Sequence, residues 1–152
     1  RKPLWKKLEE AKKQLLWGLE HAEVVKISDE EVEFLFGMGV EEGARHILTI
    51  YAVKLVFVTC GPQGCYFQNR LCSGHVPSLS GIQVMDTTGA GDIFGGSAVS
   101  RLLKIGMHPA ELSVEQMYAV GSFASTAASL STEKSGGIPS IPQEEDVYSA
   151  CK

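Results

Sequence analysis

The sequence lacks the features that would place the chain in a membrane or on a nucleic acid. None of its apolar runs approaches the ~20 residues that a membrane-spanning helix needs. The opening stretch, RKPLWKKLEEAKKQ, has no apolar core behind its positive charges, as a signal peptide would have. The formal net charge of −4 leaves no basic excess for a general nucleic-acid binder. We therefore expect a cytoplasmic protein with no membrane or nucleic-acid partner.

Cysteine is present without any metal-binding pattern. The four cysteines form no C-x-x-C pair and have no companion histidines at zinc spacing. They are Cys60, Cys65, Cys72 and Cys151. We interpret them as reduced thiols, and a Cys60–Cys65 bridge is the less favoured alternative.

Three familiar site motifs are missing as well. The phosphate-binding pattern G-x-x-x-x-G-K-[ST] and the serine-hydrolase pattern G-x-S-x-G do not occur. The dinucleotide pattern G-x-G-x-x-G starts at Gly89 and Gly91 but has Phe94 where the third glycine belongs. A dinucleotide-dependent oxidoreductase is therefore disfavoured, although it stays open as a class.

What is present predicts one α/β domain with a mostly parallel sheet. The length of 152 residues and a hydrophobic fraction of 44% suit a single core. Strands are expected over residues 22–28, 53–61 and 81–86, with 64–69 as the returning arm of a hairpin. Helices are expected over residues 4–20, from Ser28 to Gly37, and over 40–51, 92–104, 113–131 and from 143. Ser28 and Glu31 have the spacing of a capping box.

A glycine-rich turn, DTTGAGD, precedes the helix that is expected to begin near Asp92. A helix N-terminus presents unpaired N–H groups and attracts anions. Glycine lets the backbone approach phosphate oxygens closely. A carboxylate there could act as a general base toward a substrate hydroxyl. The plain alternative is that Asp92 is only a residue favoured at helix starts.

The DTTGAGD segment resembles the C-terminal signature of the ribokinase-like, or pfkB, carbohydrate kinases. VVKISDEEVEFL is similar to that family's strand-to-helix segment, VFVTCGPQGCYF to its nucleotide hairpin, and SGGIPSIP to the loop that closes its nucleotide site. RKPLW and KISDEE look closest to the fructokinase branch, and 2-keto-3-deoxygluconate kinases share the R-x-x-L-W element. The resemblance implies a three-layer ribokinase-like fold.

The resemblance implies a role for several residues, each of which also has a plain structural explanation. Asp92 would be the catalytic base, with the backbone of Gly89, Ala90 and Gly91 as anion hole. The nucleotide-binding residues would be Thr59, Gly61, Gly64, Thr87, Ser125 and Gly136. A monovalent cation, K⁺, would be held by Asp86, Thr88, Ser131, Gly136 and Ser140. Glu31 would act on Mg²⁺ through water, although serine replaces the family's Asn at Ser28, and Arg1 would face the sugar.

The implied activity is phosphorylation of a sugar, fructose to fructose 6-phosphate, by Mg-ATP. The alternatives are a 2-keto-3-deoxygluconate kinase, another sugar or nucleoside kinase of the family, or a catalytically incomplete nucleotide-binding fragment. The family's sugar-binding and lid elements are not in the sequence, which does not begin with Met. We expect residues 1–152 to form the C-terminal, nucleotide-binding part of such a kinase, and a homodimer is one state open to the intact protein.

Overall fold

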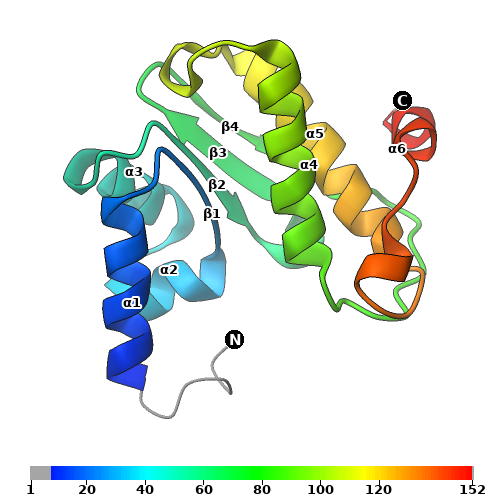
Figure 1. Ribbon diagram of the computed structural model, residues 1–152, viewed down its shortest axis with the longest axis horizontal. Helices are drawn as coiled ribbons and strands as arrows, with labels where there is room; N and C mark the ends of the chain where they lie inside the picture. Colours follow the sequence, from blue (N-terminus) through cyan, green and yellow to red (C-terminus); the bar gives the residue numbers. More distant parts are fainter. Residues whose placement is uncertain (1–7, 152) are drawn as a thin grey trace.

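A four-stranded sheet organises the chain, in the order β1-β2-β3-β4 (Figure 1). The computed structural model describes residues 8–151, so the expectations for Arg1 and Leu4 lie outside the described residues. The strands are β1 (Val24–Ser28), β2 (Leu55–Thr59), β3 (Cys65–Asn69) and β4 (Ser73–Val76). The helices are α1 (Leu8–Glu20), α2 (Asp29–Phe36), α3 (Val40–Ile50), α4 (Ala90–Ile105), α5 (Val114–Ser131) and α6 (Glu144–Ala150). Single turns of 3-10 helix are η2 (Gly61–Gln63), η3 (Pro109–Glu111) and η4 (Ile138–Ser140).

Helices cover both faces of the sheet because β2 is apolar on both sides. Val56 and Val58 belong to a core shared with α1, α2 and α3. Leu55 and Phe57 alternate with them and belong to a second core with α4 and α5. A strand buried on both faces is thus sandwiched between helix layers, which confirms the interpretation of its continuous apolar run.

The sheet is mixed, and this corrects the expectation of a mostly parallel one. Only β1 and β2 pair in parallel, whereas β2–β3 and β3–β4 are antiparallel. The reason is the length of the connections: η2 and residues 70–72 join neighbouring strands by turns too short for a parallel crossover.

One predicted strand is absent, and one strand was not predicted. Residues 81–86 form no strand, because the N–H groups of Met85 and Asp86 both donate to the carbonyl of Thr132 at the end of α5. The fourth strand is instead Ser73–Val76, whose sequence SGHV carries little strand propensity. Its place comes from the antiparallel ladder that it forms with β3.

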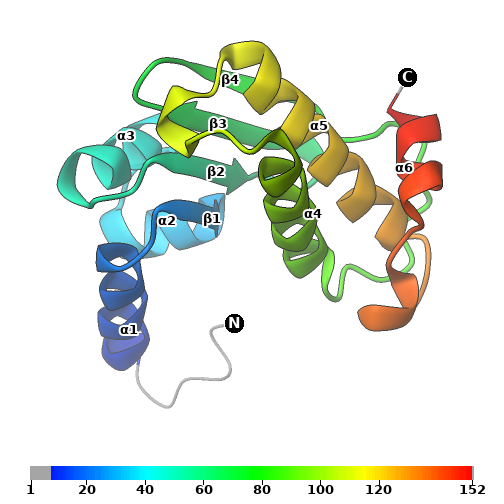
Figure 2. The ribbon, with the colours of Figure 1, turned by 45° about the horizontal axis from the view of Figure 1, so that its top comes forward.

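The helix boundaries follow the local sequence signals. In α2 the predicted capping box is present: the Ser28 hydroxyl accepts the Glu31 N–H and the Glu31 carboxylate accepts the Ser28 N–H. The helix α4 begins at Ala90, earlier than expected, and ends before Gly106, which adopts the left-handed conformation. In the turned view, α6 lies beside α5, away from the sheet (Figure 2).

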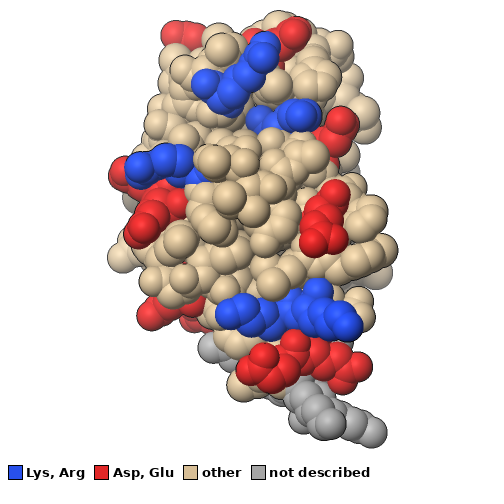
Figure 3. All heavy atoms as spheres, turned by 90° about the vertical axis from the view of Figure 1, so that its left-hand side faces the viewer, with Lys and Arg blue, Asp and Glu red and all other residues tan. Residues whose placement is uncertain are grey.

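The charges on the face drawn in Figure 3 are interspersed, with acidic side chains close to basic ones and no continuous basic patch on that face. Within residues 8–151, no helix combines the length and the apolar character that crossing a membrane requires. All four cysteines are free thiols, as expected. Burial raises the pKa of the Cys65 thiol, which keeps it protonated.

Candidate nucleotide and phosphate site

One cavity of about 280 Å³ gathers residues from three separated segments of the chain. The hairpin between β2 and β3, the segment from Ser78 into the start of α4, and the C-terminal half of α5 all contribute to it. Seven of the predicted site residues line it: Thr59, Gly61, Gly64, Thr87, Ala90, Gly91 and Ser125. Its remaining walls are largely apolar, with Ile82, Val84, Phe94 and Ala128 among them. An apolar slot with a few polar groups is typical of a small-molecule site.

The hairpin on one side of this cavity requires glycine. Gly64 has φ +95°, and a Cβ built there would lie 2.1 Å from the carbonyl oxygen of Val76. Gly61 has φ +53° but has open space where a Cβ would be. Gly64 therefore permits a close approach between the turn and the end of β4. At Gly61, glycine is favoured only because the backbone has a positive φ.

The start of α4 forms the other side, and it has the features of an anion site. Gly89 caps the helix with φ +82°, and its carbonyl accepts the N–H of Ile93. The N–H of Ala90 donates to the carbonyl of Thr87 at 3.2 Å. Of the three residues expected to form the anion hole, Ala90 therefore already has its N–H bonded within the turn. The N–H groups of Gly91 and Asp92 have no acceptor among residues 8–151. Unpaired N–H groups at a helix N-terminus attract negative charge.

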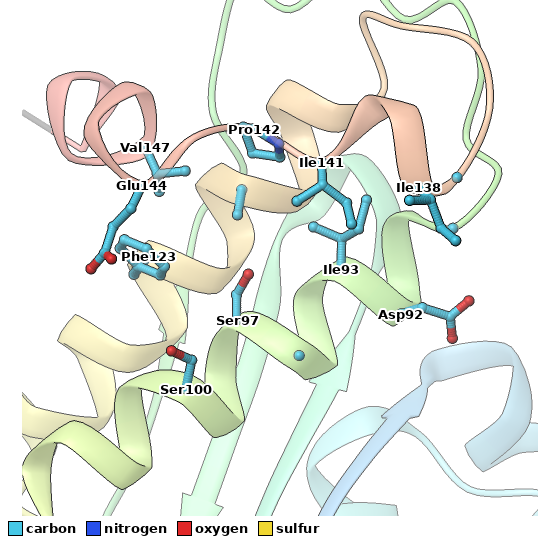
Figure 4. Close-up of a pocket in the computed structure, with 14 residues that line it drawn as sticks. Asp92, Ile93, Ser97, Ser100, Phe123, Ile138, Ile141, Pro142, Glu144 and Val147 are labelled. Atoms are coloured by element: carbon cyan, nitrogen blue, oxygen red, sulfur yellow. The ribbon is translucent and has the colours of Figure 1, made fainter.

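The carboxylate of Asp92 is exposed at this helix start. It borders a second cavity, of about 420 Å³, between α4, α5 and the segment that leads into α6. Figure 4 shows Asp92 at one end of this cavity, with its carboxylate turned away from Phe123 and Glu144 at the other end. Asp92 is thus free to meet a solvent-borne group.

A lysine that the sequence interpretation did not single out lies beside these amides. A Cβ built on Gly91 would be 2.9 Å from Nζ of Lys26, so the β1 side chain reaches the backbone of the α4 turn. This ammonium adds a full positive charge to the partial charge of the helix end. The available signal was a lysine between the apolar residues Val25 and Ile27 of the strand VVKIS.

The loop after α5 meets the DTTGAGD segment through Asp86. One carboxylate oxygen of Asp86 accepts the N–H of Thr88 and the other accepts the N–H of Gly136, both at 2.9 Å. These two hydrogen bonds lower the pKa of Asp86 to about 2, and the bond from Gly136 has the larger effect. The predicted cation ligands Asp86, Thr88 and Gly136 are therefore brought together, and the carboxylate is anionic at neutral pH.

The other predicted ion ligands have local partners. The buried hydroxyls of Ser131 and Ser140 donate to the carbonyls of Ala128 and Gly137, at 2.7 Å each. The carboxylate of Glu31 is occupied by the capping box. Among residues 8–151, no three His, Cys, Asp or Glu side chains gather into a metal-binding group. A Mg²⁺ ion would therefore rely mainly on phosphate oxygens and water, which is its common mode of binding.

Comparison with known proteins identifies the same family as the motifs. The model of the pfkB family of carbohydrate kinases matches residues 1–144. Fructokinase-1 of Zea mays is 40% identical over 149 residues, which cover 97% of this chain and 45% of the relative. Fructokinase-2 of Solanum lycopersicum is 32% identical over 154 residues, covering 100% of this chain and 46% of the relative. The chain thus spans a little under half the length of these relatives.

Solved structures agree with the fold. A fructokinase with bound ATP from Xylella fastidiosa gives a TM-score of 0.86 at 26% identity, covering 99% of this chain and 48% of that one. A fructokinase from Vibrio cholerae O395, in a form bound to fructose, ADP and calcium ion, gives 0.81 at 26% identity, covering 99% and 47%. These likenesses confirm the ribokinase-like α/β fold.

Proposed function

Since the chain belongs to the pfkB family of carbohydrate kinases, we propose that the protein of which it forms part phosphorylates a sugar hydroxyl with ATP. Fructose, giving fructose 6-phosphate, is the acceptor we favour, because the relatives named above are fructokinases. A 2-keto-3-deoxygluconate kinase or another sugar or nucleoside kinase of the family is the alternative. The observation that carries the proposal is the single cavity shared by the Thr59–Gly64 hairpin and the α4 turn, beside the exposed Asp92.

Each part of the site has a distinct task in this proposal. The apolar walls of the 280 Å³ cavity suit a nucleobase, and Ser125 offers a hydroxyl there. The free N–H groups of Gly91 and Asp92 would face the terminal phosphate, with Lys26 balancing its charge. Lys26 also offsets the repulsion between the Asp92 carboxylate and that phosphate.

Asp92 would accept the proton of the sugar hydroxyl as its oxygen attacks phosphorus. The bound Mg²⁺ supplies charge neutralisation on the phosphate oxygens, and Glu31 would reach it through water. The oxygen-rich set of Asp86, Thr88, Ser131, Gly136 and Ser140 would hold K⁺ near the loop that contacts Gly89. Arg1, which lies outside the described residues, would contact the sugar.

The second candidate function is nucleotide binding without phosphoryl transfer. Because the chain spans under half of these relatives, it could bind nucleotide without transferring phosphate. Precise positioning of the reacting hydroxyl contributes much of catalysis, and in this proposal only Arg1 and Asp92 of this chain meet the sugar.

Two measurements test these proposals. Titration calorimetry of the chain with ATP should detect binding, and no binding at millimolar ATP would refute the nucleotide site. Fructose-dependent ADP release is then assayed for the chain joined to the part of the maize relative that it does not match. Asp92→Asn should lower kcat by about 10²- to 10⁴-fold while ATP binding is retained, and the exposed Asp146→Asn serves as matched control. Equal activity in both variants would reject Asp92 as the base, and ATP binding without any turnover would support the nucleotide-binding fragment.

A further inference from the structure

The helix α6 is too short and too exposed to hold its place unaided. It has seven residues, and Val147 is the only one of them that is buried. Val147 packs with Phe123 and Ala127 of α5 in a small apolar cluster. A helix of two turns is not stable by itself in water, so its position depends on contacts with neighbouring helices.

Two cations of α4 supply those contacts. Lys104 forms an ion pair with Glu144, and Nη1 of Arg101 donates to the Tyr148 hydroxyl. The Arg101 guanidinium also lies 5.2 Å from the ring centroid of Phe123 and 5.4 Å from that of Tyr148. A guanidinium near two aromatic faces gains cation–π attraction on each of them. Arg101 thus joins α4, α5 and α6 at one point.

The segment between α5 and α6 depends on this anchor. Residues 132–143 leave the end of α5, pass the start of α4 and lead into α6. On the way, Gly136 donates its N–H to Asp86, and Gly137 lies so close to Gly89 that a Cβ there would be 3.1 Å from the Gly137 Cα. The 420 Å³ cavity lies beneath this segment, and Ile138 and Ile141 are exposed (Figure 4). Because Ile138 and Ile141 add little packing, the position of α6 at one end of the segment contributes to where the segment lies.

We propose that Arg101 is a positioning residue: by clamping α6 onto α4 and α5, it holds Gly136 and Gly137 against Asp86 and Gly89. The clamp thereby fixes the Gly136–Gly137 side of the phosphate and cation site from roughly three turns further along α4. This role stands on the geometry of residues 8–151 and does not require that the chain transfers phosphate.

The test measures the loop and α6 separately, by NMR on the whole chain without ligands. In Arg101→Gln, amide exchange of Gly136 should accelerate by about three- to tenfold, and the nuclear Overhauser effect between the Hα atoms of Gly89 and Gly137 should weaken. Arg101→Lys, which keeps the charge, should recover part of both signals. Arg45→Gln, the same change on the exposed face of α3, is the matched control and should alter neither.

Faster exchange confined to residues 144–150, with Gly136 and the Gly89–Gly137 signal unchanged, would overturn the proposal, as would no change at all. If Arg101→Gln fails to fold, as judged by far-UV circular dichroism, Tyr148→Ala decides instead. That variant removes the α6 half of the clamp from an exposed position. It should give the same two changes, and an unaltered loop in it refutes the clamp.

Discussion

Gly89 and Gly137 face each other where the turn before α4 meets the loop after α5: a Cβ on Gly89 would lie 3.1 Å from the Cα of Gly137. Gly89 also has φ +82°, a conformation that L-residues avoid. Two loops separated in the sequence by the whole of α4 and α5 thus meet through a pair of residues without side chains. The approach joins the candidate anion site to the candidate cation site.

Gly89→Ala should therefore weaken both folding and nucleotide binding. The left-handed conformation and the tight contact predict a loss of about 1–2 kcal/mol in the free energy of unfolding, measured by urea denaturation. ATP affinity of the chain should fall in the same variant. Gly95→Ala, inside α4 with open space around it, is the control and should stabilise the chain by about 0.5–1 kcal/mol. Equal effects of the two changes would contradict the importance of the contact.

Gly64→Ala and Gly61→Ala separate close packing from backbone conformation in the hairpin. Both residues have positive φ, but only a Gly64 Cβ would overlap another atom, the Val76 carbonyl oxygen at 2.1 Å. We expect Gly64→Ala to lower the free energy of unfolding by about 3 kcal/mol and Gly61→Ala by about 1 kcal/mol. Thermal and urea unfolding measure the difference, and similar losses in both variants would argue against the contact with β4.

The features that the sequence predicts well are determined by residues close together in the chain. The capping box of Ser28 and Glu31, the glycine hairpin and the DTTGAGD turn each depend on local chemistry, and the structure contains all three features. The hairpin and the DTTGAGD turn line one cavity, although residues 81–86 form no strand.

Features set by distant partners were not predictable. Residues 81–86 have the apolar alternation of a strand, but their backbone pairs with Thr132 instead. The SGHV segment has little propensity for a strand and becomes one through its ladder with β3. The approach of Lys26 to Gly91 likewise depends on how β1 and α4 pack, which no single segment reveals.

The Asp86 carboxylate should make stability depend on pH in the acidic range. Its pKa is lowered from 3.8 to about 2 by the N–H groups of Gly136 and Thr88. A carboxyl whose folded pKa lies below its unfolded value contributes stability above the unfolded pKa and loses it as the pH falls toward the folded one. The gap in unfolding free energy between the chain and Asp86→Asn should be constant at neutral pH and shrink between about pH 4 and 2.

Urea titrations at a series of pH values measure this gap. The unmodified chain, measured at the same pH values, is the reference. A gap for Asp86→Asn that stays constant down to pH 2 would show that the two N–H bonds do not stabilise the charged form.

Lys26→Met tests whether the α4 turn is an anion site at all. The lysine ammonium lies beside Gly91, whose N–H is unpaired among residues 8–151, so a phosphate bound there would contact both. Losing a charge-assisted hydrogen bond should weaken ATP binding by about ten- to a hundredfold, measured by titration calorimetry. The salt dependence of binding should also become shallower, because one positive charge is lost. Lys54→Met, just before β2 at the opposite end of the strands, should preserve both the affinity and the salt dependence. If the two variants bind ATP equally well, the phosphate does not lie at this helix terminus, and the role given to Asp92 loses its geometric basis.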